Sequence, residues 1–165
     1  MWKTTIWNQF GAAIDMLENA IAACPDNLWG DRTRRPEFWY VAYHTIFFLD
    51  LYLSESPEGF APPAPFTLSE LDPSGILPER VYSKSELQTY LAHCRRKFES
   101  VVGGLTEKSA RAHREFRSVK GTLAEVLIYA TRHVQHHAAQ LNLILRQVTD
   151  ASPRWVGQAK TKPTS

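Results

Sequence analysis

Apolar residues recur every three or four positions in four stretches of the sequence, and this period is that of an amphipathic α-helix. The expected helices span about residues 2–23, 36–54, 84–102 and 122–148. Pro25 closes the first of them, and glycines at positions 103 and 104 follow the third. Runs that alternate between apolar and polar residues are nearly absent, so we expect an all-α fold.

The last of these helices has the most regular pattern. Thr122 and Glu125 have the spacing of a capping box, in which each side chain bonds the backbone N–H of the other residue. Steps of four and three residues then connect the positions of a seam, the line that faces the centre of a helical bundle. The positions of this seam are Leu123, Leu127, Ala130, Val134, His137, Leu141, Ile144 and Val148. The helix expected at 36–54 has a comparable seam at Val41, His44, Phe48 and Leu51.

The stretch between residues 55 and 83 is rich in proline and glycine and has no sustained helical period, which predicts a long irregular connection. A connection of this length can cross the end of a bundle and let the helices on either side run parallel. A second polar connection, which includes residues 111–121, leads into the last helix. We expect a bundle domain at residues 1–150 and a loose polar tail at 151–165, with Trp155 as its candidate anchor.

Length, charge and cysteine content narrow the class of protein. A chain of 165 residues with 44% apolar and 22% charged residues has the size and composition of one globular domain. Its 19 basic and 17 acidic residues are spread along the chain, which argues against nucleic-acid binding. Cys24 and Cys94 form no CxxC pair, so they predict neither zinc binding nor redox chemistry. Polar residues interrupt the apolar runs, and we expect no signal peptide, no membrane span and a cytoplasmic location.

Three histidines occupy or adjoin the two seams. His133 and His137 lie one helical turn apart on one face, because consecutive residues are about 100° apart around a helix. His44 takes the corresponding position in the second expected helix. Buried imidazoles need partners for their ring nitrogens, and a divalent metal ion is such a partner at about 2.0–2.1 Å per bond. The sequence therefore predicts that His44, His133 and His137 bind a metal ion between two helices.

The alternative is that these side chains are polar core groups of a bundle whose surface serves dimerisation or partner binding. A single histidine on an apolar stripe is more often of that kind, and an i, i+4 pair arises by chance as well as in metal sites. The presence of all three histidines on the two seams favours the metal site over the polar-core interpretation. His136 is turned about 100° from His137, so we expect it behind the ligands or in solvent. His93 and His113 lie off the seams and are expected at the surface.

The motif H-x-x-H-H-x-x-Q extends here from His133 to Gln140. Together with a seam histidine in the second helix, it resembles the pattern of the DinB/YfiT superfamily, over about residues 1–148. In that family the histidine of the second helix and the first and last histidines of the motif bind the metal, which implies this role for His44, His133 and His137. The family often has Arg-Gly before the glutamine, whereas this chain has two alanines there, so a substrate contact by that arginine does not carry over.

The resemblance implies a four-helix bundle of up-down-down-up topology, with the proline-rich connection between its second and third helices. It also implies a homodimer that holds nickel, zinc or a similar divalent ion. Some relatives are similar to thiol-S-transferases and isomerases that use low-molecular-weight thiols such as bacillithiol or mycothiol, and many members have no known reaction. We therefore expect a metal-dependent transferase or hydrolase acting on a small molecule, or else a non-catalytic metal-binding or stress-related bundle.

Three imidazoles leave at least one position of a tetrahedral ion open, as in catalytic metal sites. Water or a thiol in that position loses its proton more easily than in solution. The sequence identifies no general base, because Glu125 is explained by the capping box and both Asp15 and Asp50 lie off the expected seams. The catalytic residues therefore stay unassigned at this point.

Two further features near the histidines have more than one interpretation. Gln140 lies on the same side of its helix as His133, where it either orients a ligand or is a polar boundary residue. Trp39, Tyr40 and Tyr43 precede His44 by about one turn, and they either line a substrate pocket or pack in the core.

Overall fold

The computed structural model describes residues 2–162, which are mostly helical. The four long helices are α1 (Trp2–Ala23), α3 (Phe38–Tyr52), α4 (Lys84–Gly103) and α6 (Leu123–Thr149). The short elements are α2 (Asp26–Trp29), the 3-10 helix η1 (Ser69–Leu71), α5 (Glu107–Ala110) and the strands β1 (His113–Phe116) and β2 (Val119–Thr122). The long helices lie in the four stretches in which the sequence predicts helices. None of the described helices is both long and apolar enough to cross a membrane.

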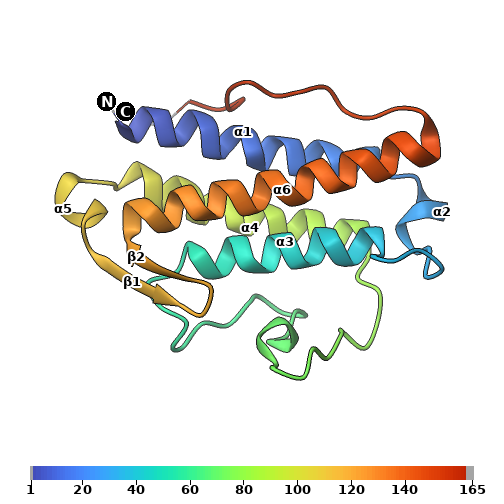
Figure 1. Cartoon of the computed structure of the whole chain (residues 1–165), viewed down its shortest axis with the longest axis horizontal. Helices are drawn as coiled ribbons and strands as arrows, with labels where there is room; N and C mark the ends of the chain where they lie inside the picture. Colours follow the sequence, from blue (N-terminus) through green and yellow to red (C-terminus); the bar gives the residue numbers. More distant parts are fainter. Residues whose placement is uncertain (1, 163–165) are drawn as a thin grey trace.

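The long helices pack side by side around one apolar core (Figure 1). α6 packs against α1 and α3, and α4 packs against the same two helices. α1 and α6 begin at one end of this group, whereas α3 and α4 begin at the other (Figure 1). The chain between α3 and α4 returns beside α3, where the Tyr43 hydroxyl donates to the Thr67 carbonyl at 3.2 Å. The long connection therefore covers part of the outer side of α3.

α3 is buried on almost every side. Its only residues that are not buried are Tyr40, His44 and Phe48, which are half-buried and share one face of the helix. His44 and Phe48, which the sequence places on the seam facing the core, both pack against histidines of α6 but are half-buried and not central. α3 carries apolar side chains on all its faces, so its sequence does not distinguish the central face from the partly open one.

α6 begins as the sequence predicts. The Thr122 hydroxyl accepts a hydrogen bond from the Glu125 N–H at 3.3 Å, and the Glu125 carboxylate accepts one from the Thr122 N–H at 2.7 Å, which confirms the capping box. The predicted seam is buried from Leu123 to Ile144 except at the half-buried His137. Val148, the expected end of the seam, is 42% exposed, because the last turn of α6 extends beyond α3 (Figure 1).

A β-hairpin takes the place of the irregular connection expected before α6. β1 and β2 pair antiparallel, with Phe116 opposite Val119. Only Phe116 is buried in β1, and strands of four residues are too short for an alternating pattern to stand out in the sequence. The Phe116 ring packs against Tyr52 of α3 with 5.5 Å between ring centroids. The hairpin is therefore attached to the end of α3, and the expectation of a purely helical fold is corrected.

The described part of the tail is bound to α1, which corrects the expectation that residues 151–165 are loose. The Ala159 N–H donates to the Asn8 carbonyl at 3.0 Å, and the Lys160 N–H donates to the buried carboxylate of Asp15 at 2.7 Å. Trp155, the expected anchor, is 71% exposed. The tail thus returns along α1 through its backbone (Figure 1), and residues 163–165 lie outside the described part of the chain.

Gly11 lies where the tail comes closest to α1, and its replacement tests this packing. A Cβ atom at position 11 would lie 2.6 Å from the Cβ atom of Ala159, although alanine is favoured over glycine inside a helix by about 1 kcal/mol. We expect Gly11→Ala to displace the tail and to make the bond after Lys160 accessible to trypsin, as measured by limited proteolysis with mass spectrometry. Gly103→Ala is the control, because its Cβ meets no atom within 4 Å. Equal cleavage of the two variants would contradict the packing described here.

Candidate metal centre

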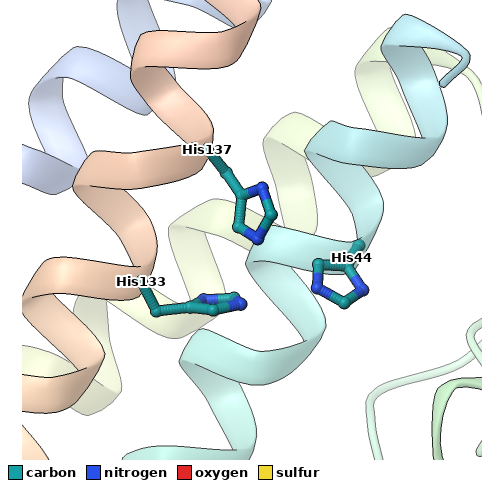
Figure 2. Close-up of side chains that lie close together, drawn as sticks. All are labelled: His44, His133 and His137. Carbon is teal, nitrogen blue, oxygen red and sulfur yellow. The ribbon is translucent and has the colours of Figure 1, made fainter.

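His44, His133 and His137 lie together between α3 and α6. The distances between ring centroids are 4.6 Å for His133 and His137, 4.9 Å for His44 and His137, and 5.4 Å for His44 and His133. Each ring offers one nitrogen, and these three nitrogens lie within 4.8 Å of one another. Figure 2 shows one nitrogen of each ring pointing into the space between the three side chains. Among the described residues, no other group of three histidine, cysteine or acidic side chains has this geometry.

Helix packing explains why the three rings meet. His133 and His137 lie one turn apart on α6, and the contact between α6 and α3 brings both of them to His44. The Phe48 ring lies 4.8 Å from the His44 ring and 5.7 Å from the His133 ring, which closes one side of the group. The group therefore lies at the partly open edge of the α3–α6 contact and not in the middle of the core.

Two of the three rings are held by a second side chain. Nδ1 of His44 lies 2.6 Å from Oε2 of Glu70, and Nδ1 of His137 lies 2.7 Å from Oε1 of Gln140. When each Nδ1–H donates to its oxygen acceptor, the lone pair of Nε2 is left free, and this arrangement is typical of metal-binding histidines. Of the two interpretations of Gln140, the geometry supports an orienting role, and the group that it orients is the His137 ring.

Glu70 is the residue of this site that the sequence analysis missed. It lies in η1 within the proline-rich connection, and its side chain is only 3% exposed. The connection has no helical or strand period, so no local pattern separates Glu70 from the other acidic residues there. Its position depends on the fold of the connection against α3.

The surroundings of the rings favour uncharged imidazoles. Burial, with the neighbouring histidines, lowers the pKa of His133 to about 3. Burial also lowers the pKa of His137, and the hydrogen bond that its ring donates to Gln140 opposes part of this effect. Both rings are therefore neutral at pH 7, which is the form that binds metal ions.

The donor set fits a divalent transition metal ion. Neutral imidazoles suit zinc, nickel, copper and iron alike. His133 has a buried Nδ1 atom without a hydrogen-bond partner among the described residues, so this ring is not held by a polar network that would explain its burial without a ligand. The three rings, two of them oriented through Nδ1, therefore form a suitable site for one such ion.

The other histidines lie outside this group. His136 is exposed, and His113 is exposed on β1, as the sequence predicts for both. The His93 side chain is 40% exposed but approaches Asp50, with 3.5 Å between Nε2 and Oδ1. Asp50 itself is 1% exposed, which corrects the expectation that it lies away from the packed faces.

Buried carboxylates elsewhere in the bundle have partners from other helices. Asp50 accepts hydrogen bonds from Nζ of Lys97 at 2.6 Å and from the Tyr90 hydroxyl at 3.0 Å. Asp15, also 1% exposed, forms an ion pair at 2.9 Å with Arg95. Both carboxylates therefore connect α4 to its neighbours, and neither lies among the three histidines.

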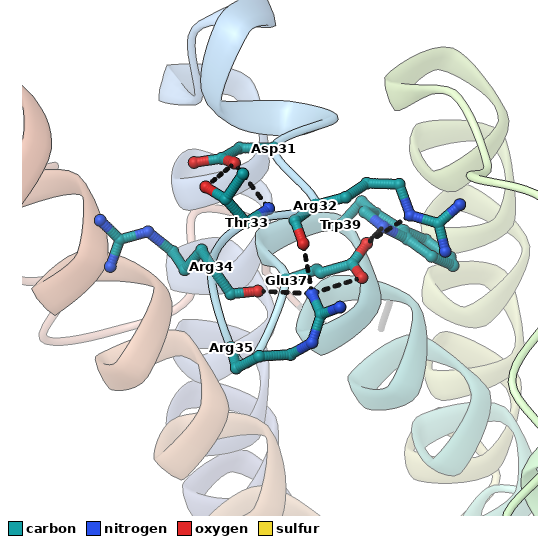
Figure 3. Close-up of polar contacts among 7 residues, drawn as sticks. All are labelled: Asp31, Arg32, Thr33, Arg34, Arg35, Glu37 and Trp39. Carbon is teal, nitrogen blue, oxygen red and sulfur yellow. Dashed lines mark hydrogen bonds and ion pairs between the residues drawn. The ribbon is translucent and has the colours of Figure 1, made fainter.

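The aromatic residues near the start of α3 divide into two kinds. Trp39 and Tyr43 are buried in the core, whereas the half-buried Tyr40 ring lies 6.2 Å from the His44 ring. The Trp39 indole donates to the buried Glu37 carboxylate at 2.6 Å, and the Arg35 guanidinium donates to the same carboxylate at 2.9 Å (Figure 3). This network fixes the start of α3. Of the three aromatic residues, only Tyr40 borders the three histidines.

The protein is a helical bundle in which three histidines meet between two neighbouring helices, α3 and α6. A family model of the DinB superfamily matches residues 9–141. The chain therefore belongs to the DinB superfamily, as its histidine motif predicts. No curated protein and no solved structure matches the chain.

The lowered pKa of His133 predicts how acid destabilises the metal-free protein. Between pH 6.5, the ordinary pKa of histidine, and about 3, the unfolded chain binds a proton at His133 that the folded chain does not. The free energy of unfolding should therefore be highest above pH 6.5 and fall as the pH decreases through this window. We expect His133→Gln to flatten this part of the pH dependence in urea denaturation with a chelator present. His113→Gln, at an exposed histidine, should follow the wild type, and an unchanged slope in His133→Gln would refute the assignment.

Proposed function

We propose that the protein binds one divalent metal ion, nickel or zinc, through His44, His133 and His137 and acts as a metal-dependent transferase or hydrolase on a small molecule. The observation that carries this proposal is the meeting of three ring nitrogens within 4.8 Å. Membership of the DinB superfamily supports it, because the resemblance of the histidine motif to that family implies metal binding at these positions. We also propose that this bundle has the up-down-down-up topology that the resemblance to the family implies.

The number of ligands favours an enzyme over a structural metal site. Structural zinc sites are closed by four protein ligands, whereas catalytic sites use three and keep a position for water or substrate. Glu70, the acidic residue beside His44, is bonded to the His44 ring and is not part of the group of three. A bound ion supplies charge that lowers the pKa of water or a thiol at its open position. Glu70 and Gln140 hold two of the ligand rings in place, and burial keeps the His133 and His137 rings neutral.

The histidine ligands can be tested one at a time. We expect His44→Ala, His133→Ala and His137→Ala each to weaken zinc or nickel binding by more than about 100-fold, since loss of a supporting contact alone weakens metal binding by about 10–100-fold. His136→Ala, His93→Ala and His113→Ala are controls that should keep the wild-type affinity. Isothermal titration calorimetry on protein made without an affinity tag measures both sets. A His44→Ala variant that binds as tightly as the wild type would rule out a site shared by the two helices.

The same protein loaded with nickel distinguishes an enzyme from a passive metal binder. Exogenous thiol or azide should change the absorption spectrum of the bound nickel if a coordination position is open. A metal ion that binds the folded chain and not the unfolded chain also raises the melting temperature of the protein. The variants of the three histidines should lose this increase. A spectrum that does not respond to thiol or azide would favour the non-catalytic alternative.

We also propose that the protein is a homodimer. Apolar side chains on the outer side of α6 are exposed, among them Ile128 (52%) and Leu143 (57%), and burial of such side chains stabilises association. Light scattering at micromolar concentration should therefore give about twice the chain mass of 18.8 kDa. Ile128→Ser with Leu143→Ser should shift the mass to that of the monomer. A monomeric wild type would refute the dimer and leave the metal site unaffected.

A further inference from the structure

A cleft of about 230 Å³ lies beside the three histidines. Three segments that are distant in sequence form its walls: α3 contributes Phe48 and Tyr52, the proline-rich connection contributes Glu70 and Leu71, and the hairpin contributes Phe116 and Arg117. Two of these residues also touch the metal centre, because Phe48 packs against the His44 ring and Glu70 bonds its Nδ1 atom. The cleft therefore adjoins the centre without including any of its three ligands.

Glu70 has one carboxylate oxygen without a partner. Its side chain is 3% exposed, and its Oε2 atom is hydrogen-bonded to Nδ1 of His44. Oε1 is buried and makes no hydrogen bond among the described residues, although the Tyr40 hydroxyl lies close to the same carboxylate. A buried carboxylate oxygen without a donor is unfavourable, and such orphaned polar atoms mark places where a ligand can supply the missing bond. The Glu70 side of the cleft thus calls for an N–H or O–H donor.

Arg117 gives the cleft a cation as well. It lies in the turn of the hairpin, is exposed, and is the only basic residue among the described residues that line the cleft. No carboxylate of the described chain forms an ion pair with it. A guanidinium without an ion pair suits a carboxylate, which it binds through two parallel hydrogen bonds. The other residues that line the cleft are mainly apolar, with Phe48, Leu71 and Phe116 among them.

We propose that this cleft binds a small aminocarboxylate, with its ammonium group on Oε1 of Glu70, its carboxylate on Arg117 and a short apolar chain between them. The statement that this molecule is a substrate rests on the proposed function. The binding itself does not, because the cleft residues contact the molecule without the metal ion. Because Glu70 also holds His44, the amine end of the molecule lies on the side of the metal centre. Opposite charges among the residues that line an apolar cleft select for a ligand that carries both groups.

The test compares three molecules of similar length on metal-free protein: 6-aminohexanoate, hexanoate, which lacks the amine, and hexylamine, which lacks the carboxylate. Their affinities are measured by titration with two-dimensional NMR, which also reports where each molecule binds. We expect 6-aminohexanoate to bind at least about tenfold more tightly than either control and to shift the signals of residues 48, 70–71 and 116–118. Equal affinity of the three molecules, or shifts elsewhere on the protein, would overturn the proposal.

Two variants assign the ends of the molecule. Arg117→Gln should weaken 6-aminohexanoate about tenfold and leave hexylamine unchanged, while Glu70→Gln should weaken 6-aminohexanoate and hexylamine and leave hexanoate unchanged. Lys120→Gln is the matched control, because Lys120 lies on the same hairpin but does not line this cleft. Equal effects of Arg117→Gln and Lys120→Gln would refute a specific contact with Arg117. Arg117 and Lys120 are both exposed, so neither substitution is expected to unfold the protein. The comparison of these two variants therefore tests the proposal even if Glu70→Gln is unstable.

A parallel zinc titration separates this proposal from the proposed function. Zinc binding without aminocarboxylate binding would refute the cleft assignment and leave the metal site intact. Aminocarboxylate binding to a protein that does not bind zinc would support the cleft and refute the metal-dependent function.

Discussion

The contact between α3 and α6 is the interaction on which the site depends. Helices in such a bundle pack with axes about 8–10 Å apart, so side chains on facing turns can reach a common point. α3 is fixed in this contact by burial of every residue except Tyr40, His44 and Phe48. The His44 side chain of α3 therefore lies on the only face of the helix that the core leaves partly open, where an imidazole replaces little apolar packing.

Buried polar contacts hold the remaining parts of the bundle in register. Asp50 binds Lys97 and Tyr90 of α4, and Asp15 binds both Arg95 of α4 and the backbone of the tail. Removal of one partner from a buried pair leaves an uncompensated charge, which costs about 3–5 kcal/mol. These contacts therefore restrict how α4 and the tail pack, although apolar contacts supply most of the core.

Local geometry explains which features the sequence predicts. The helices follow from their apolar period, the capping box from the spacing of Thr122 and Glu125, and the pairing of His133 with His137 from one helical turn. The sequence does not show which part of the α3 seam is partly open, because an almost wholly apolar helix has no polar face to orient it. The hairpin and the bound tail depend on contacts with distant segments, such as Phe116 on Tyr52, and four-residue strands carry too little pattern to reveal them.

Glu70 illustrates how a residue without a local signal can connect two parts of a site. Its Oε2 atom orients the His44 ring, while its Oε1 atom is buried beside the cleft without a partner. The two oxygens share one negative charge, so a donor that binds Oε1 draws charge away from Oε2 and weakens its hold on His44. Because the basicity of a metal-binding imidazole depends on the acceptor at its other nitrogen, a ligand bound in the cleft as proposed would change the donor strength of His44 toward a metal ion. The proline-rich connection thus links the cleft to the three histidines through one carboxylate, a link that neither helix could provide by itself.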